Sequence, residues 1–175
     1  MRKICVNKKI LFLMDTVIVA VLLILDQFTK HLAVVHLKDQ PAIPLIEGVL
    51  ELDYLENRGV AFGMFQNQRF IILLTGIVFM AVILFVMYKM PVNKKFMLLH
   101  IVFSCIMAGG MGNMIDRVTL GYVVDFISFV LIHFPIFNVA DCYVVCATIV
   151  LFIVYLFILK EEDLDFLSFR KAKEK

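Results

Sequence analysis

Two aspartates, Asp125 and Asp141, are the side chains most suited to chemistry, because both stand among apolar residues in the stretch GYVVDFISFVLIHFPIFNVAD (121–141). A carboxylate in apolar surroundings is costly unless it is paired, protonated or bound, so both are candidates for a functional site. Each also has a structural interpretation. Asn138 and Asp141 have the spacing of a helix N-cap and a first-turn acid, and Asp125 could be an ordinary loop acid. Taken singly, both interpretations stay open.

A pair of carboxylates that shares one proton can hydrolyse a peptide bond without a metal, a serine triad or a reactive cysteine. Like charges at close range cannot both ionise, so the two apparent pKa values separate. The ionised member removes a proton from water, and the protonated member hydrogen-bonds the scissile carbonyl. If Asp141 lies in the first turn of a helix, the dipole favours its charged form. Asp141 is then the starting base and Asp125 the protonated partner. Because the two acids share one proton, the proton belongs to the pair and the two roles can exchange.

Metal and thiol chemistry find little support in the sequence. The four histidines form no HExxH or HxxxH pair, and the four cysteines form no CxxC motif. His133 is close in sequence to the acids but is more typical of an interfacial loop than of a metal ligand. No metal site and no cofactor are predicted.

Composition identifies an integral membrane protein, because 62% of the 175 residues are hydrophobic. A net charge of +2 is too small to indicate a nucleic-acid partner. Four apolar segments are long enough to span a bilayer, the first being an uncleaved signal anchor without a small-x-small cleavage site. Their expected ranges are about 10–32, 70–88, 96–117 and 138–159.

The rest of the chain is assigned around these spans. Residues 1–160 are expected to form a single four-helix membrane domain, and residues 161–175 a charged cytoplasmic tail. Between the first two spans, Pro and Gly interrupt any helix, and alternation over 50–55 predicts a small β element on the extracytoplasmic membrane surface. The segment 117–135 is expected to be a loop. Asp15 is expected to snorkel from the cytoplasmic end of the first span.

The distribution of Lys and Arg orients the chain. With the N-terminus inside, 12 of the 17 basic residues are cytoplasmic, which supports both termini on that side. The polar residues of the spans and loops then concentrate at the extracytoplasmic ends. The five basic residues left on that side are Lys30, Lys38, Arg58, Arg69 and Arg117.

Two of the spans carry polar groups at their outer ends. Asp26 and Lys30 are four residues apart on one helical face, where they can pair. On the third span, Gly109, Asn113 and Asp116, with Arg117 beside them, share a face next to a run of small residues that permits close approach. Asp116 and Arg117 could instead close an ion-pair network with the first span and hold the bundle together.

Five motifs follow one another along the chain: DQFTK (26–30), ENRGVAFG (56–63), GGMGNMIDR (109–117), VVDF (123–126) and FNVAD (137–141). In this order and approximate spacing they resemble lipoprotein signal peptidase, the type II signal peptidase of bacteria, over nearly the whole chain. The resemblance implies an all-α, four-span aspartyl endopeptidase of the bacterial inner or plasma membrane. It would remove signal peptides from prolipoproteins, cutting on the amino side of a diacylglyceryl-modified cysteine at the extracytoplasmic face.

The resemblance also assigns residues and partners. Asp125 and Asp141 would be the catalytic pair, and Asp26 and Lys30 match a motif of the family's first helix. Lipidated prolipoproteins and membrane lipids are the implied partners, and a monomer is expected. Asp116 is predicted to support the site with Asp26 and Lys30. The residues implied to position the substrate are Asn57, Gly109, Asn113, Arg117 and Asn138.

Two other classes of protein compete with the peptidase. A small proton-coupled transporter would place its acids near mid-bilayer and align them across it. A non-catalytic assembly subunit would tolerate replacement of either Asp125 or Asp141. The acids cluster at the outer surface, which argues against the transporter, and the family resemblance is the main reason that the peptidase is favoured.

Overall fold

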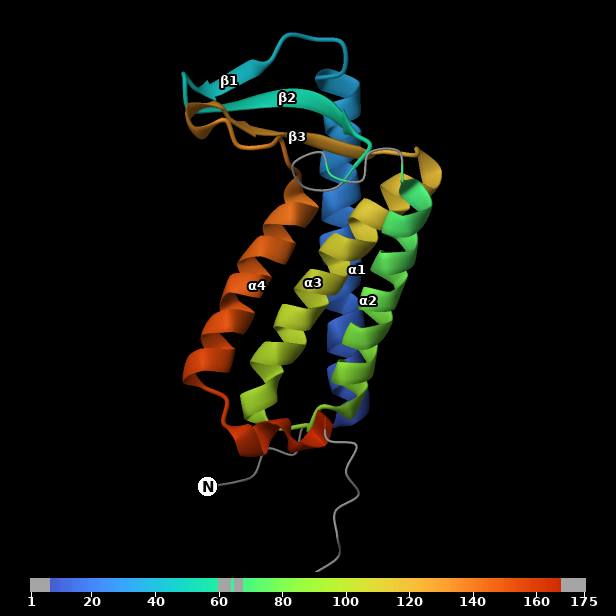
Figure 1. The fold of residues 1–175 in the computed structure, drawn as a ribbon, viewed down its shortest axis with the longest axis vertical. Helices are drawn as coiled ribbons and strands as arrows, with labels where there is room; N and C mark the ends of the chain where they lie inside the picture. The colour runs from blue at the N-terminus through green and yellow to red at the C-terminus, as the bar shows by residue number, and fades with distance from the viewer. Residues whose placement is uncertain (1–6, 60–63, 65–67, 168–175) are drawn as a thin grey trace, which may run out of the picture.

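Four long helices lie side by side, and a small sheet covers one end of them (Figure 1). This computed structural model describes residues 7–59, 64 and 68–167. All four helices are long and apolar enough to cross a membrane, as the sequence predicts. They are α1 (Lys8–His36), α2 (Arg69–Lys89), α3 (Lys94–Thr119) and α4 (Val139–Phe157).

Local sequence signals set the helix ends. Asn7 caps α1 by accepting a hydrogen bond from the backbone N–H of Lys9 at 2.9 Å, and Asn93 caps α3 in the same way. Met90, which follows α2, has an extended backbone because it precedes a proline. Helix α1 extends past the predicted range 10–32 at both ends, since no Gly or Pro interrupts the chain there.

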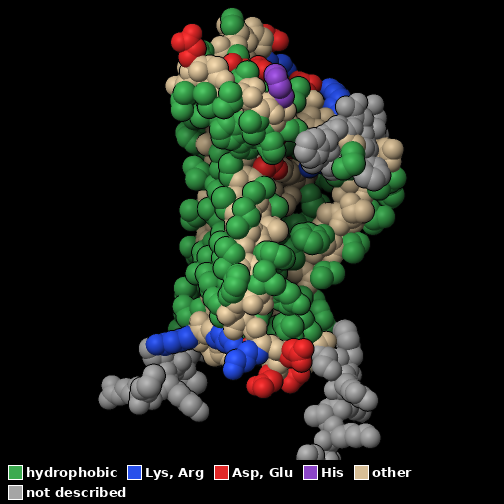
Figure 2. Space-filling model, turned by 60° about the vertical axis from the view of Figure 1, so that its left-hand side comes forward, with side chains coloured by type: hydrophobic (Ala, Val, Ile, Leu, Met, Phe, Trp, Pro, Cys, Tyr) green, Lys and Arg blue, Asp and Glu red, His purple; other side chains and the backbone are tan. Residues whose placement is uncertain are grey.

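Apolar side chains cover the outside of the bundle, and charged side chains gather at its two ends (Figure 2). Phe70 of α2 is 78% exposed and Phe157 of α4 is 80% exposed, which is costly in water and favourable in lipid. Helix α3 lies at the centre of the bundle. Half of the residues in its most apolar stretch are buried (50%), compared with 11–17% in the corresponding stretches of the other three helices. Helix α3 therefore packs against all of its neighbours while they face outward.

Glycines of α3 let the helices approach closely. The carboxylate of Asp26 on α1 occupies the place where a Cβ of Gly112 would be. A Cβ on Gly109 would lie 2.5 Å from the backbone oxygen of Ala140 on α4, whereas one on Gly110 would meet open space. Small residues thus bring α1 and α4 against α3 at the level of the polar motifs.

The sheet has three antiparallel strands in the order β1 (Ile43–Ile46), β2 (Leu50–Asn57) and β3 (Val123–Phe129). The prediction of a β element between the first two helices is confirmed for β1 and β2. The expected loop over 117–135 is wrong, because it contains β3. The strand was missed because four successive residues from Val123 are buried, so no alternation of polar and apolar residues marks it.

The expected snorkelling of Asp15 is also wrong. Its side chain turns into the bundle, where one carboxylate oxygen lies 2.8 Å from Nδ1 of His100. The hydroxyl of Ser104 donates to the other oxygen at 3.4 Å. Since both partners belong to α3, tertiary contact outweighs the preference of an acid for the membrane surface. Asp15, His100 and Ser104 are called the inner polar cluster below.

The start of the charged tail docks at the end of the bundle opposite the sheet (Figure 1). Residues Glu161–Leu167 form a short 3-10 helix, η3. Phe166 meets the ring of Phe96 edge-on with 5.6 Å between centroids, and Asp163 pairs with Lys95. The rest of the predicted tail, 168–175, lies outside the described residues.

Candidate active site

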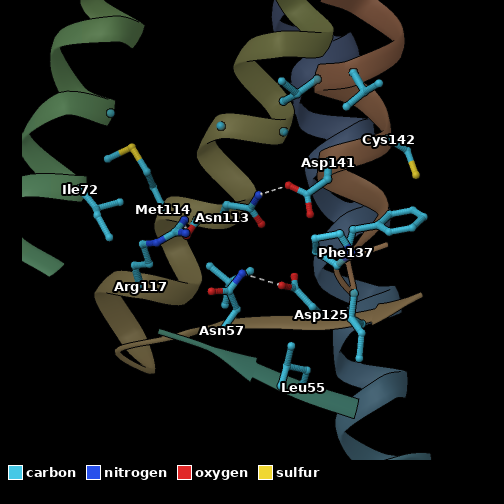
Figure 3. A pocket seen from close by; sticks show the side chains of 18 of the residues that line it. Leu55, Asn57, Ile72, Asn113, Met114, Arg117, Asp125, Phe137, Asp141 and Cys142 are labelled. Atoms are coloured by element: carbon cyan, nitrogen blue, oxygen red, sulfur yellow. Dashed lines mark hydrogen bonds between the residues drawn. The ribbon is translucent and has the colours of Figure 1, made fainter. Parts of the chain in front are cut away.

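A cavity of about 1460 Å³ opens between α2, α3, α4 and the sheet, and Asp125 and Asp141 both line it. Asp125 comes from β3 and Asp141 from the first turn of α4 (Figure 3). Strand β3 is held in place by β2, whose Leu55 is the register partner of Asp125. The walls are otherwise mostly apolar. The structure thus brings together two acids that are sixteen positions apart in the sequence.

Asp125 is almost fully buried, with 1% of its surface exposed. Its two carboxylate oxygens accept hydrogen bonds from the side-chain amides of Asn57, at 2.8 Å, and Asn138, at 2.6 Å. The pKa of Asp125 is raised to about 6, mainly by burial and also by the negative charge of Asp141, while the two amide donors oppose the increase. A carboxyl group in this range changes protonation near neutral pH.

Asp141 is surrounded by N–H donors. The amide of Asn113 donates to one oxygen at 2.8 Å, and the backbone N–H of Asn138 donates to the other at 3.1 Å. Asp141 also donates its own backbone N–H to the side chain of Asn138, completing a capping box. The N-cap interpretation of Asn138 and Asp141 is therefore confirmed, and the same geometry holds the Asp141 carboxylate in the cavity.

Asn138 connects the two acids. Its side-chain amide reaches Asp125 while its backbone N–H reaches Asp141, and it is fully buried. Its amide also lies 3.1 Å from the side-chain oxygen of Asn113. Although predicted to position substrate, Asn138 does not belong to the cavity lining, and its contacts are with the acids themselves. One residue thus sets the relative placement of the candidate pair.

A buried ionic cluster lies beside this pair. The ammonium group of Lys30 is 3.0 Å from Asp26 and 3.0 Å from Asp116, which confirms that Asp26 and Lys30 pair. Gln27, which the sequence interpretation missed, donates to Asp26 at 3.2 Å and to Asp116 at 3.0 Å. The feature that could have identified Gln27 in the sequence is an amide side chain next to Asp26 within an apolar span. These groups compensate one another, as intramembrane charges require.

Arg117 and Gly109 both line the cavity, and Arg117 does not form the alternative ion-pair network with the first span. The guanidinium of Arg117 donates to the backbone oxygens of Asn113, at 3.2 Å, and Gly59, at 2.7 Å, so it joins α3 to the end of β2 and not to the first helix. Gly109 borders the cavity, yet its open side is filled by α4. The neighbouring Gly110 leaves open space on the cavity wall.

Taken together, the site presents the carboxyl groups of Asp125 and Asp141, the amides of Asn57 and Asn113 and the guanidinium of Arg117 at one part of a mostly apolar cavity. Both acids accept hydrogen bonds from N–H donors, but Asp125 is buried with a raised pKa while Asp141 lies in the first turn of α4, and a general acid and a general base require such different surroundings. Among the described residues, no group of three or more His, Cys, Asp or Glu is placed to hold a metal ion. The arrangement suits hydrolysis of an amide bond in a substrate with apolar parts.

Comparison with known proteins gives the same family in each case where a family is named. Residues 18–157 match the family model described as signal peptidase (SPase) II. A lipoprotein signal peptidase of Caldanaerobacter subterraneus subsp. tengcongensis is 44% identical over 79% of this chain and 92% of its own length. The lipoprotein signal peptidase of Clostridium tetani is 39% identical over 87% of this chain and 96% of its own length.

Solved structures show the same fold. A bacterial membrane enzyme determined by the in meso method at 1.9 Å resolution superposes with a TM-score of 0.72 at 26% identity, covering 83% of this chain and 94% of that one. A second, at 2.3 Å resolution, gives a TM-score of 0.71 at 24% identity and covers 91% and 94%. The arrangement of helices and sheet is therefore one already seen in membrane enzymes.

Proposed function

The chain belongs to the signal peptidase II family, and we propose that Asp125 and Asp141 are the catalytic pair of this member. The protein is a multi-pass membrane protease of the aspartic type that removes signal peptides from lipoprotein precursors. The observation that carries the assignment of the pair is the cavity that both carboxylates line, with Asp125 buried at a raised pKa and Asp141 in the first turn of α4.

In the proposed mechanism, Asp141 begins ionised and Asp125 begins protonated. Asp141 removes a proton from a water molecule, the water oxygen bonds to the scissile carbonyl carbon, and Asp125 donates a hydrogen bond to the carbonyl oxygen. When the C–N bond of the tetrahedral intermediate breaks, the leaving nitrogen takes a proton from the pair. The amide of Asn113 and the backbone N–H of Asn138 each donate a hydrogen bond to Asp141 and hold its carboxylate in the cavity.

The surrounding polar residues are proposed to act in two ways. Asn57, Asn113 and Asn138 hold the two carboxylates, because each donates to one of them. Arg117 places a positive charge on the cavity wall and is proposed to bind backbone oxygens of the substrate. Gly109 is proposed to act by letting α4 approach α3, while the open surface at Gly110 accepts the substrate backbone.

The substrate is proposed to be cut on the amino side of a cysteine that carries diacylglycerol. The largely apolar cavity supports this, because acyl chains and a signal helix need apolar walls next to the acids. Leu55, Ile72 and Phe79 supply such walls from the sheet and α2. Lipids of the surrounding bilayer and lipidated precursors are the proposed partners, and the working form is proposed to be a monomer.

Both termini are proposed to lie in the cytoplasm of a bacterial cell, with the sheet and the acids at the extracytoplasmic face of the inner or plasma membrane. The distribution of Lys and Arg supports this orientation. Residues 1–160 are proposed to be the peptidase domain. The docking of Glu161–Leu167 on the helix ends suggests that this part of the tail also belongs to the folded unit.

The test is cleavage of a diacylglyceryl-modified prolipoprotein peptide by the detergent-purified full chain. The parent protein is compared with Asp125→Asn and Asp141→Asn, and with Asp163→Asn at the opposite end of the bundle as a matched control. The proposal predicts cleavage before the lipidated cysteine by the parent and the control, and none by the two site variants. Near-normal turnover by either site variant, with the fold intact, would show that its aspartate is structural.

A further inference from the structure

The side-chain amide of Asn113 has two faces with opposite chemistry, so its orientation decides what it gives to Asp141. Its oxygen accepts hydrogen bonds from the ammonium of Lys30 at 2.8 Å and from the amide of Asn138 at 3.1 Å. A lysine ammonium only donates, so the amide oxygen must face Lys30. The NH₂ group then faces Asp141 and donates to it at 2.8 Å.

Lys30 cannot easily turn away from this position. Its ammonium has three N–H donors and three acceptors, which are Asn113, Asp26 and Asp116 at 2.8, 3.0 and 3.0 Å. Only 4% of the side chain is exposed, so water does not compete for these contacts. The orientation of Asn113 is therefore set mainly by the charged group of Lys30, whose donors are all occupied, with a longer hydrogen bond from the Asn138 amide beside it.

The two acids bound to Lys30 also hold the backbone next to each catalytic residue. Asp26 accepts a hydrogen bond at 3.1 Å from the backbone N–H of Ala140, the residue before Asp141. Asp116 accepts one at 3.1 Å from the backbone N–H of Val124, the residue before Asp125. The ionic cluster thus contacts β3 and α4 at neighbouring positions on either side of the cavity.

We propose that Lys30 is a positioning residue of the reaction, which holds the amide of Asn113 in the one orientation that donates to Asp141. This inference rests on the proposed function, because it assumes that Asp141 is the starting base. Without Lys30 the amide can rotate and present its oxygen to the Asp141 carboxylate, which repels it. The expected consequence is a loss of turnover rather than of substrate binding.

A purely structural role for Lys30 is to neutralise Asp26 and Asp116, and the two roles can be separated. Lys30→Met alone changes the formal charge of the cluster from −1 to −2, since two acids lose one cation. Lys30→Met/Asp116→Asn returns it to −1, and the replacement amide can still accept from the Val124 N–H. If neutralisation is the whole role, this double variant regains both stability and activity.

The experiment measures kcat, KM and thermal unfolding of the full chain with the lipidated peptide. Lys30→Met/Asp116→Asn is expected to unfold near the parent temperature but to lose roughly 10- to 100-fold in kcat, as for loss of a hydrogen bond to a charged group. KM should change little. Lys8→Met, the same substitution near the other end of α1, should cleave like the parent.

A double-mutant cycle with Asn113→Ala tests whether Lys30 acts through that residue. The losses caused by Asn113→Ala and by Lys30→Met/Asp116→Asn should not multiply when combined, because both remove one interaction. Multiplicative losses, or parent-like kcat in Lys30→Met/Asp116→Asn, would overturn the inference. Failure of the parent to cleave would instead overturn the proposed function.

A second pair of variants covers the case in which the methionine double variant does not fold. Lys30→Gln/Asp116→Asn keeps an N–H donor at position 30 and the same cluster charge. Its kcat, corrected for the fraction of folded protein, is expected to be higher than that of Lys30→Met/Asp116→Asn. It is also expected to be higher than the kcat of Asn113→Ala. A kcat no better than that of Asn113→Ala would count against positioning through the amide.

Discussion

The candidate active site and the inner polar cluster both contain buried acids, but those acids have different partners. Asp15 has a histidine at 2.8 Å and a serine hydroxyl, and neither it nor its partners line the cavity. Asp125 and Asp141 have only N–H donors from amide side chains and backbone, with no Lys, Arg or His nitrogen within 4 Å among the described residues. A carboxyl group without a salt-bridge partner is not held in its ionised form and can carry a proton for transfer. Asp125 is such a group, and its pKa is raised.

The ionic cluster around Lys30 shares features with both the inner polar cluster and the candidate active site. Its acids are directly paired with a cation, yet they also hold the backbone beside the reactive acids. The contacts in this chain follow a rule: the acids that hold the bundle together have a basic partner, and the proposed catalytic acids have amides. The predictions below test that rule.

The largest effect is expected from substitution of the proposed catalytic pair. Asp125→Asn and Asp141→Asn should each lower kcat/KM by about 10²- to 10⁴-fold, the range for loss of a general acid or base. Because no salt bridge is broken, their unfolding temperatures should stay near that of the parent. Peptide cleavage and thermal unfolding in the same detergent check both points. A variant that unfolds easily but still cleaves would reverse the rule.

The inner polar cluster should respond in the opposite way. Asp15→Ala leaves His100 and Ser104 without their buried acceptor, so the free energy of unfolding should fall by about 1–3 kcal/mol. Its kcat/KM at a temperature where the variant is folded should match the parent. Asp15→Leu/His100→Phe, which removes both ionisable groups, should recover part of the stability. Loss of activity in the folded Asp15→Ala variant would link the two regions.

Neighbouring glycines of α3 give a smaller, matched test. Gly109→Ala places a methyl group against the Ala140 backbone and should cost about 1–3 kcal/mol of stability, the range for overpacking. Gly110→Ala meets open space and should leave stability unchanged or slightly higher, since alanine favours helix. Thermal unfolding of the two variants separates them. Equal effects would mean that α4 is not held against α3 at Gly109.

The smallest effect is a shift along the pH axis. Asp125 must be protonated at the start, and its pKa is raised to about 6, so kcat/KM should fall as pH rises through the apparent pKa of the pair. Asn57→Ala removes a donor that favours the ionised form, so this limb should move to higher pH. Lys38→Met, an exposed change nearby, should leave it in place.

Stability should follow the same sign. The pKa of Asp125 rises on folding from 3.8 to about 6, so the unfolded chain releases this proton first. The free energy of unfolding should therefore decrease as pH rises across that interval. Asp125→Asn should flatten this part of the profile. For the kcat/KM profile, a descending limb that moves to lower pH in Asn57→Ala would show that the Asn57 amide does not stabilise the ionised form of Asp125.

The sequence predicts much of the fold because long apolar segments and their breaks are local features. The four helices follow from such segments, and the pairing of Asp26 with Lys30 follows from helical spacing. Strand β3 could not be predicted in the same way. It is buried along most of its length and is defined by its pairing with β2, a contact between distant segments.

The candidate site, like the fold, could be predicted from the sequence only in part. The motifs indicate which polar residues belong together, but the role of each depends on side-chain direction. Asn138 was predicted to position the substrate, and the structure adds that it joins the two acids, because its side chain turns inward from the start of α4. Asp15 was expected at the surface and is buried, because its partners on α3 are 85 and 89 positions away.

The pairing of Leu55 with Asp125 makes the site sensitive to chain length as well as to residue type. Successive side chains of a strand point to opposite faces, so a single-residue insertion or deletion that shifts β3 would turn Asp125 away from the cavity. At the β1–β2 turn, Gly48 has a φ of +70° and a Cβ there would contact nothing within 4 Å. Added residues should be tolerated at that turn, whereas one extra residue between Gly121 and Asp125 should abolish cleavage.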